Sequence, residues 1–171
     1  MDFFSVIESR RSVRLYQEAP IEPEKLQKVL EAADLAPSAG NLQGYEIYLI
    51  TNLEQRQGLD QAAYGQTFIS QAPVVLVFCA NPSRSSVRYR DRGRKLYCIQ
   101  DATISCTFAM LAAQALGLST VWVGAFNDDA VRQAAGIPAE LIPVALLPIG
   151  YGAESPGRRP RRPLNKIVHI L

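Results

Sequence analysis

Seven of the chain's fourteen arginines lie near its two ends, and their spacing suits the binding of a single phosphate. The sequence reads SRRSVR at residues 9–14 and RRPRRP at residues 158–163. A guanidinium is a planar fork of donors that binds a phosphate through two bonds, and a hydroxyl such as that of Ser12 adds another donor. If folding brings the two ends together, these residues form an anion pocket. The alternative is that arginines near chain ends are solvated and counter nearby acids.

Size and charge limit the class of protein and its partners. The chain has 171 residues, which suits a single domain with a real hydrophobic core, and we expect residues 1–171 to form one domain. Its net charge of +2 is too small for nucleic-acid binding by bulk electrostatics. The first residues lack the features of a signal peptide, and the most apolar helix candidate, residues 99–116, is too polar to span a membrane. These observations favour a cytoplasmic protein with no nucleic-acid or membrane partner.

Few residue types are available for direct catalysis. The three cysteines, Cys79, Cys98 and Cys106, form no C-x-x-C pair, and His169 is the only histidine. A metal site or a Ser-His-Asp triad would depend on that single histidine, so we expect neither. The chain also lacks the G-x-G-x-x-G and P-loop glycine patterns. A cofactor is therefore the expected source of any chemistry, with its phosphate held by arginine side chains.

Apolar spacing and turn residues predict helices and strands without a regular alternation. Asp2 is a suitable N-cap for a first helix that ends before the arginines, and Pro23 suits the first turn of a second helix that Pro37 ends. A turn-rich stretch follows at residues 37–41. The later candidates are strands at residues 45–51, 74–78, 119–123 and 143–149, and helices at residues 53–63, 97–116 and 128–135.

Three segments stand out because of the surface that they would present. The helix at residues 97–116 is apolar around most of its circumference, which places it at the centre of its domain or in a subunit interface. The apolar ending at residues 167–171 would be a liability if exposed, so we expect it to pair with something, such as a strand edge of a second subunit. Residues 82–95 are polar and carry five arginines, and we expect an exposed excursion between elements.

Six segments taken together resemble the FMN-dependent nitroreductase family in its short, single-domain form. They are ESRRSVR at residues 8–14, APSAGNLQ at 36–43, QAPVVLVFCA at 71–80, GRKLYCIQDAT at 93–103, GLSTVWVGAF at 117–126 and RPRRPL at 159–164. They occur in the family's order and cover nearly the whole chain. There are two departures from the family pattern. Gly44 stands where a proline is usual, and Thr107 and Phe108 stand where many relatives carry a Gln-Asn pair, which bears on the substrate rather than on flavin binding.

The resemblance implies an α+β fold, in which a mixed β-sheet is flanked by helices in a three-layer α/β/α sandwich. It also implies an intertwined homodimer with two FMN sites at the subunit interface. By the same resemblance, a C-terminal arm of about residues 153–171 reaches across the dimer and adds a strand to the sheet of the partner.

The resemblance also implies which residues hold the phosphate of FMN. Arg10 and Ser12, together with Arg159 and Arg161 from the tail, would bind it through charge-assisted hydrogen bonds. Arg11 would line the ribityl and phosphate end of the site.

Other residues are implied to surround the flavin ring. Arg14 would point toward the pyrimidine edge, where a cation stabilises the negative charge of the reduced ring; a surface ion pair with Glu18 is the alternative. The turn-rich segment would supply backbone and side-chain groups to the ribityl hydroxyls and the ring. Its implied residues are Pro37, Ser38, Ala39, Asn41 and Gln43. Val123 and Gly124 would approach the ring with backbone groups, since glycine permits close contact.

The function that the resemblance implies is an FMN-dependent NAD(P)H oxidoreductase that reduces nitroaromatics, quinones or similar flat acceptors by a ping-pong hydride mechanism. No side chain is nucleophile or general base, because flavin N5 carries the chemistry and Arg14 acts only as an electrostatic stabiliser. The alternatives are other flavin chemistry, such as reductive dehalogenation or dehydrogenation, and a non-catalytic flavin-binding sensor. Residues 84–94 are either a cover that attracts anionic acceptors or a nicotinamide phosphate, or a solvated loop. No motif distinguishes NADH from NADPH.

Overall fold

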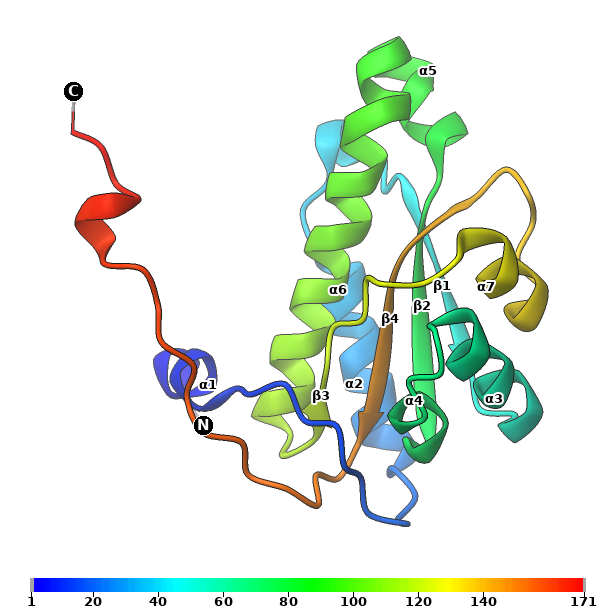
Figure 1. The fold of residues 1–171 in the computed structure, drawn as a ribbon. Coiled ribbons are helices and arrows are strands. Elements are labelled where there is room, and N and C mark those ends of the chain that lie inside the picture. The colour runs from blue at the N-terminus through cyan, green and yellow to red at the C-terminus, as the bar shows by residue number, and fades with distance from the viewer. Residues whose placement is uncertain (1, 171) are drawn as a thin grey trace.

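The computed structural model describes residues 2–170, and its core is a four-stranded sheet with helices on both faces (Figure 1). The strands are β1 (Tyr45–Ile50), β2 (Val74–Ala80), β3 (Ser119–Thr120) and β4 (Ile142–Gly150), in the order β1-β2-β4-β3. All three neighbouring pairs are antiparallel. The parallel pairing found in the described residues is an isolated bridge between Ser12 and Thr120, so the mixed character expected of the sheet depends on that bridge.

Helices form the two outer layers. One face of the sheet is covered by α2 (Pro23–Asp34) and α6 (Cys98–Ala115), and the other by α3 (Leu53–Ala62), α4 (Phe68–Gln71) and α7 (Asp128–Ala135). The remaining helices are α1 (Phe3–Ser9), α5 (Pro82–Arg92) and the short helical turns Ala39–Asn41, Gly93–Tyr97 and Leu164–Lys166. The expected α/β/α sandwich is confirmed.

Strand β2 divides the core into two halves. Val75 and Val77 pack toward α3 and α7, whereas Leu76 and Phe78 pack toward α2 and α6. Successive side chains of a strand point to opposite faces, so a strand covered on both faces is an unbroken apolar run, as predicted here. Burial raises the pKa of the Cys79 thiol in this strand to about 12.

The helix starts follow from their capping residues. The Asp2 carboxylate accepts hydrogen bonds from the backbone N–H groups of Phe4 (3.1 Å) and Ser5 (3.2 Å), so α1 begins where predicted. Asn52 and Asn127 cap α3 and α7 in the same way. These local contacts explain why α3 and α7 lie within one or two residues of their predicted bounds.

The segment at residues 82–95 differs from its prediction. It forms α5 and then the π-helical turn Gly93–Tyr97, where an irregular excursion was expected. Asn81 caps α5, and Pro82 occupies its first turn, as helix starts prefer. The prediction was wrong because polar residues dominate this helix, so the apolar stripe that identifies a helix in a sequence is missing. The expected exposure of its arginines is confirmed.

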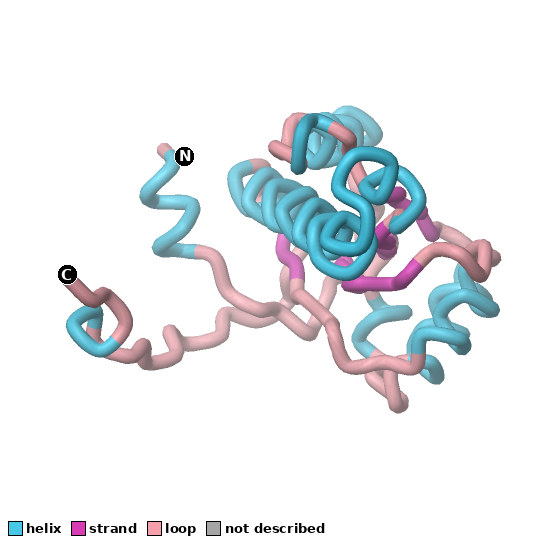
Figure 2. Tube along the Cα trace, turned by 90° about the horizontal axis from the view of Figure 1, so that it is seen from above, coloured by secondary structure: helices cyan, strands magenta, loops and turns pink. Residues whose placement is uncertain are grey.

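Both ends of the chain project from the sandwich (Figure 2). Apolar side chains on these projections are exposed, among them Phe4 (74%), Leu164 (76%) and Ile170 (96%). The last residue of the apolar ending, residue 171, lies outside the described residues. The helical run Pro82–Ala115 meets the length and composition of a membrane span, contrary to the expectation from its polar residues, yet the inner face of α6 packs against the sheet.

Candidate functional site

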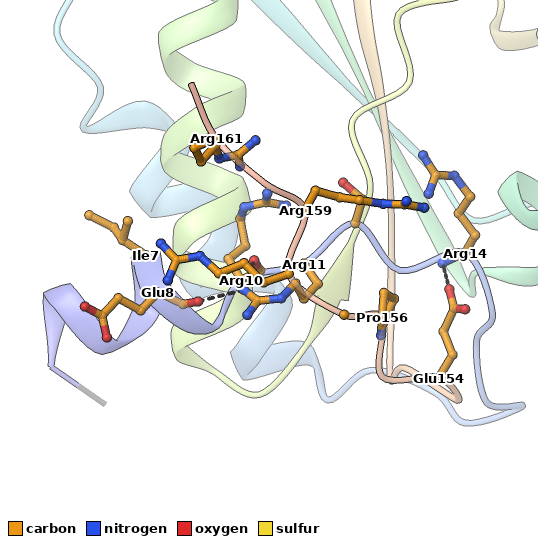
Figure 3. Close-up of a pocket in the computed structure, with 12 residues that line it drawn as sticks. Ile7, Glu8, Arg10, Arg11, Arg14, Glu154, Pro156, Arg159 and Arg161 are labelled. Carbon is orange, nitrogen blue, oxygen red and sulfur yellow. Dashed lines mark hydrogen bonds between the residues drawn. The ribbon is translucent and has the colours of Figure 1, made fainter. Parts of the chain in front are cut away.

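The two arginine-rich ends of the chain line one cavity of about 660 Å³ (Figure 3). The residues that line it are Ile7, Glu8, Arg10, Arg11, Ser12, Arg14, Glu154, Pro156, Gly157, Arg158, Arg159 and Arg161. Folding therefore brings arginines from both ends of the sequence to one place, beside only two acidic side chains.

Backbone pairing next to β3 and β4 holds the two ends together. The N–H of Val13 donates to the carbonyl of Thr120 in β3 (3.1 Å), and the N–H of Ala153, just after β4, donates to the carbonyl of Leu15 (2.8 Å). The segment after α1 therefore lies between β3 and the start of the tail. Because these bonds involve the main chain, they position the arginines without using the guanidinium groups.

The charges in this cavity repel one another. Burial lowers the pKa of the Arg10 guanidinium, and the neighbouring charges of Arg161 and Arg11 lower it further. None of the three ion pairs between described residues involves an arginine of this cavity. Arg11 donates to the carbonyls of Glu8 (2.6 Å) and Arg10 (2.9 Å), which fixes its side chain without neutralising it. Guanidinium groups that repel one another are stabilised by a bound anion.

Arg14 lies at the edge of the cavity, and its main chain is fixed. Its N–H donates to the carboxylate of Glu154, and its guanidinium lies 5.8 Å from the centre of the Phe68 ring. The alternative pairing with Glu18 is not among the ion pairs between described residues. The Arg14 charge therefore remains available to a ligand.

The turn-rich segment lines a second cavity, of about 460 Å³, with residues from the start of α6 and the turn before it. Its lining residues are Pro37, Ser38, Ala39, Tyr97, Gln100, Asp101, Thr103 and Ile104. Asn41 and Gln43 have positive φ angles of 56° and 48°, which is uncommon for residues with side chains and costs conformational energy. Ser38 stabilises this path because its hydroxyl accepts a hydrogen bond from the N–H of Gln43 (2.9 Å).

Asp101 fixes the backbone of this segment through two hydrogen bonds, although it was not among the predicted site residues. Its side chain is buried, with 2% exposure, and accepts hydrogen bonds from the N–H groups of Ala39 (2.9 Å) and Gly44 (3.2 Å). Gly44 is the residue at which proline is usual in the resemblance. A proline has no N–H for Asp101, and any Cβ at position 44 would lie 2.0 Å from the Ser85 hydroxyl oxygen. The departure at Gly44 was the one sequence signal for this contact.

Within one chain, the second cavity lies at the start of α6, whereas α1, which precedes the arginines of the first cavity, lies near the end of α6 (Figure 1). Asp101 is in the first turn of this helix. Near the end of the helix, the Nε2 of Gln114 donates to the hydroxyl of Ser9 (3.1 Å), the residue before Arg10. Thirteen residues of α-helix separate these positions, about 20 Å at 1.5 Å per residue. The structure of one chain thus does not bring residues 37–43 next to the phosphate arginines.

The two predicted positions after β3 differ in exposure. Val123 is buried and exchanges both backbone hydrogen bonds with Leu146 (3.0 and 2.9 Å), so its N–H and carbonyl are already used. Gly124 is exposed, and a Cβ there would lie 3.2 Å from the indole nitrogen of Trp122. Glycine therefore leaves the main chain accessible at this point.

Comparison with known proteins identifies the family of the chain. The family model described as Nitroreductase family matches residues 7–70 and 61–151, so the chain belongs to the nitroreductase family. It is 31% identical to a Bacillus subtilis protein named FMN reductase, NAD(P)H, over 93% of this chain and 69% of that one. It is 30% identical to a Thermus thermophilus protein named NADH dehydrogenase, over 93% and 91% of the two chains.

A solved structure supports the same assignment. The NADPH:FMN oxidoreductase from Vibrio harveyi, in complex with NAD+, superposes with a TM-score of 0.90 at 27% identity. The match covers 98% of this chain and 76% of that one. The two chains therefore share the whole sandwich, including the region of both cavities.

Proposed function

We propose that the chain is an FMN-dependent NAD(P)H oxidoreductase, an enzyme that works as a cytoplasmic homodimer on small-molecule electron acceptors. The observation that carries the proposal is the cavity that brings Arg10, Arg11 and Arg161 together, where no ion pair between described residues involves these arginines. A phosphate monoester provides about two negative charges and three acceptor oxygens, which fits such a donor set. The relatives named FMN reductase and NADPH:FMN oxidoreductase support FMN as the ligand and NAD(P)H as the donor.

Each side chain of the arginine cavity has a role in this proposal. Arg10, Ser12, Arg159 and Arg161 bind the phosphate, and Arg11 lines the ribityl end. When bound, FMN supplies two-electron chemistry between NAD(P)H and an acceptor in a ping-pong order, with nitroaromatics and quinones as the expected acceptors. No side chain of this chain needs to act as nucleophile or general base.

The remaining groups orient the cofactor and stabilise its charge. Arg14 presents a cation to the pyrimidine edge, where negative charge develops on reduction. Val123 and Gly124 approach the ring with backbone groups, and the exposed Gly124 leaves the main chain accessible there.

The homodimer completes the site. The distance of about 20 Å between the two ends of α6 supports a site in which residues 37–43 come from the partner subunit. Three exposed apolar surfaces support the same assembly: α1, the outer face of α6 with Phe108, and the tail with Leu164 and Ile170. Residues 1–171 act as one domain in this proposal, and the arm at about residues 153–171 crosses to the partner.

The first test is the absorbance spectrum of the purified protein, followed by anaerobic addition of NADH and NADPH. We expect flavin bands near ~450 nm that bleach with a nicotinamide donor. Bands that persist with both donors would indicate a sensor, and the absence of flavin after reconstitution with FMN would refute the proposal.

The phosphate assignment is tested by the double variant R10A/R161A. We expect it to fold and to lose FMN, because it removes two of the charges that bind the phosphate. R162A is the matched control, since Arg162 does not line the cavity and donates instead to the Lys166 carbonyl (2.8 Å). Full FMN occupancy in the double variant would contradict the assignment.

A further inference from the structure

Helix α5 and the turn after it carry a strong positive charge. Their cations are Arg84, Arg88, Arg90, Arg92, Arg94 and Lys95. Asp91 is the one acidic residue of this stretch, and it pairs with Lys95 at 3.2 Å. None of the arginines of this stretch belongs to an ion pair between described residues. The helix therefore presents several cations without a counterion, as the arginine cavity does.

Helix α5 contacts the turn-rich segment at residues 40–43. The Nε of Arg84 donates to the carbonyls of Leu42 (3.2 Å) and Gln43 (3.0 Å). A Cβ at Gly40 would lie 2.6 Å from the Tyr89 hydroxyl and 3.1 Å from Nη1 of Arg88. The charged helix thus borders the segment that, in the proposed function, touches the flavin.

Two arginines are fixed against a pair of tyrosines. Tyr89 and Tyr97 meet edge to face, with ring centres 5.0 Å apart and planes at 83°. The Arg88 guanidinium lies 5.5 Å from the Tyr89 ring centre, and the Arg92 guanidinium lies 5.4 Å from that of Tyr97. Arg92 also donates through Nε to the Tyr97 hydroxyl (2.9 Å). These contacts order both guanidinium groups, although Arg88 and Arg92 remain exposed residues.

This arginine–tyrosine cluster (Arg88, Tyr89, Arg92 and Tyr97) borders the second cavity, because Tyr97 and Ala39, the neighbour of Gly40, both line it. The cavity is lined by apolar and polar residues, and one of them, Tyr97, is the ring that the Arg92 guanidinium contacts. A ligand with a flat ring and an attached phosphate fits this arrangement. Its ring would enter the cavity, and its phosphate would accept hydrogen bonds from the guanidinium groups of Arg88 and Arg92.

We propose that the arginine–tyrosine cluster binds the 2′-phosphate of NADPH and makes NADPH the preferred electron donor. NADH and NADPH differ only in this phosphate, so a pair of guanidinium groups placed for it distinguishes the two. The proposal rests on the proposed function, because it places the donor beside the flavin-contacting segment. The sequence left residues 84–94 open between attracting an anionic acceptor or a nicotinamide phosphate and forming a solvated loop. The folded chain adds helix α5 and the Tyr89–Tyr97 contact, which favour the phosphate.

The test compares the FMN-loaded wild type with the double variants R88Q/R92Q and R90Q/R94Q. Both variants remove two positive charges from the same stretch, but only the first changes the cluster. The kinetic measurement is the ratio of kcat/KM for NADPH to that for NADH. The binding measurement is calorimetric titration with 2′,5′-ADP and with 5′-AMP, which differ in the 2′-phosphate and require no turnover. Flavin absorbance and circular dichroism establish that each variant is folded and loaded.

For the wild type we expect an NADPH-to-NADH ratio of at least about ten and a similar preference for 2′,5′-ADP over 5′-AMP. R88Q/R92Q should lower both preferences about tenfold or more, whereas R90Q/R94Q should retain most of each. A wild type without preference, or an equal loss in both double variants, would overturn the proposal. If neither donor reduces the flavin but 2′,5′-ADP still binds through Arg88 and Arg92, the proposed function fails while the phosphate site stands.

Discussion

Replacing Asp101 with asparagine should loosen the segment that it holds. The carboxylate accepts hydrogen bonds from the N–H groups of Ala39 (2.9 Å) and Gly44 (3.2 Å), and it is 2% exposed. Asparagine has nearly the same shape but only one acceptor oxygen, so its NH₂ group must face one of the two N–H groups. A hydrogen bond to a charged group contributes about 1.5–3 kcal/mol, and a buried donor left without a partner costs about 1–3 kcal/mol. We therefore expect the free energy of unfolding to fall by about 2–4 kcal/mol.

The assay is urea unfolding of D101N, with D60N as the matched control. Asp60 is also buried, with 4% exposure, but its side chain accepts from a single backbone group, the N–H of Ser70 (2.8 Å) in α4. The asparagine of D60N can turn its oxygen toward that single donor, so this variant should lose less than about 1.5 kcal/mol. FMN titration of both variants separates stability from function. D101N should weaken FMN binding about tenfold, because Asp101 positions the segment proposed to contact the flavin, and D60N should leave the affinity near that of the wild type.

Two results would refute this reasoning. If D101N were as stable as the wild type or more stable, the cost of burying the carboxylate would exceed the value of its two hydrogen bonds. If D101N and D60N weakened FMN binding equally, the effect would come from general destabilisation, and Asp101 would have no positioning role.

Three further perturbations test other parts of the structure. G44A should lose about 1–3 kcal/mol of unfolding free energy because its Cβ would clash with the Ser85 hydroxyl oxygen. G157A is the control, because a Cβ there has open space and should change the stability little. Equal urea midpoints for the two variants would contradict this prediction. Deleting the residues after Gly157 should dissociate the proposed homodimer, as measured by light scattering, because it removes most of the arm proposed to cross to the partner. A dimer that survives would exclude the arm as its main contact. Above pH 9 the unfolded chain ionises thiols that the folded chain keeps neutral, since burial raises the pKa of Cys79 to about 12. Stability should therefore fall from pH 9 to 12, by up to ~1.4 kcal/mol per pH unit for this thiol, and C79A should flatten the slope.

Local signals in the sequence predicted most of the helices and strands. Asp2, Asn52 and Asn127 cap helices through contacts only two or three residues away. The start of each helix can therefore be predicted from the local sequence without knowledge of the fold. The run at β2 is apolar on both faces, and a short unbroken apolar run rich in valine is typical of a covered strand. Helix α5 was missed because its polar residues carry no apolar stripe, and the four-residue helix α4 was missed because it is too short to show a period.

The sequence by itself determined the residue types: arginines at both ends that suit a phosphate, no histidine or cysteine set for direct catalysis, and an order of motifs that identifies the family. Only the tertiary structure decided which groups meet. It placed Arg10 close enough to Arg161 for their charges to interact, and it paired the backbone groups of Val123 with those of Leu146. It also brought the Asp101 carboxylate to the backbone of a segment about 60 positions earlier in the chain. Such contacts depend on how distant elements pack around the sheet, whereas caps and periodicity act over a few residues. The distance along α6 also explains why one chain alone does not complete the proposed flavin site.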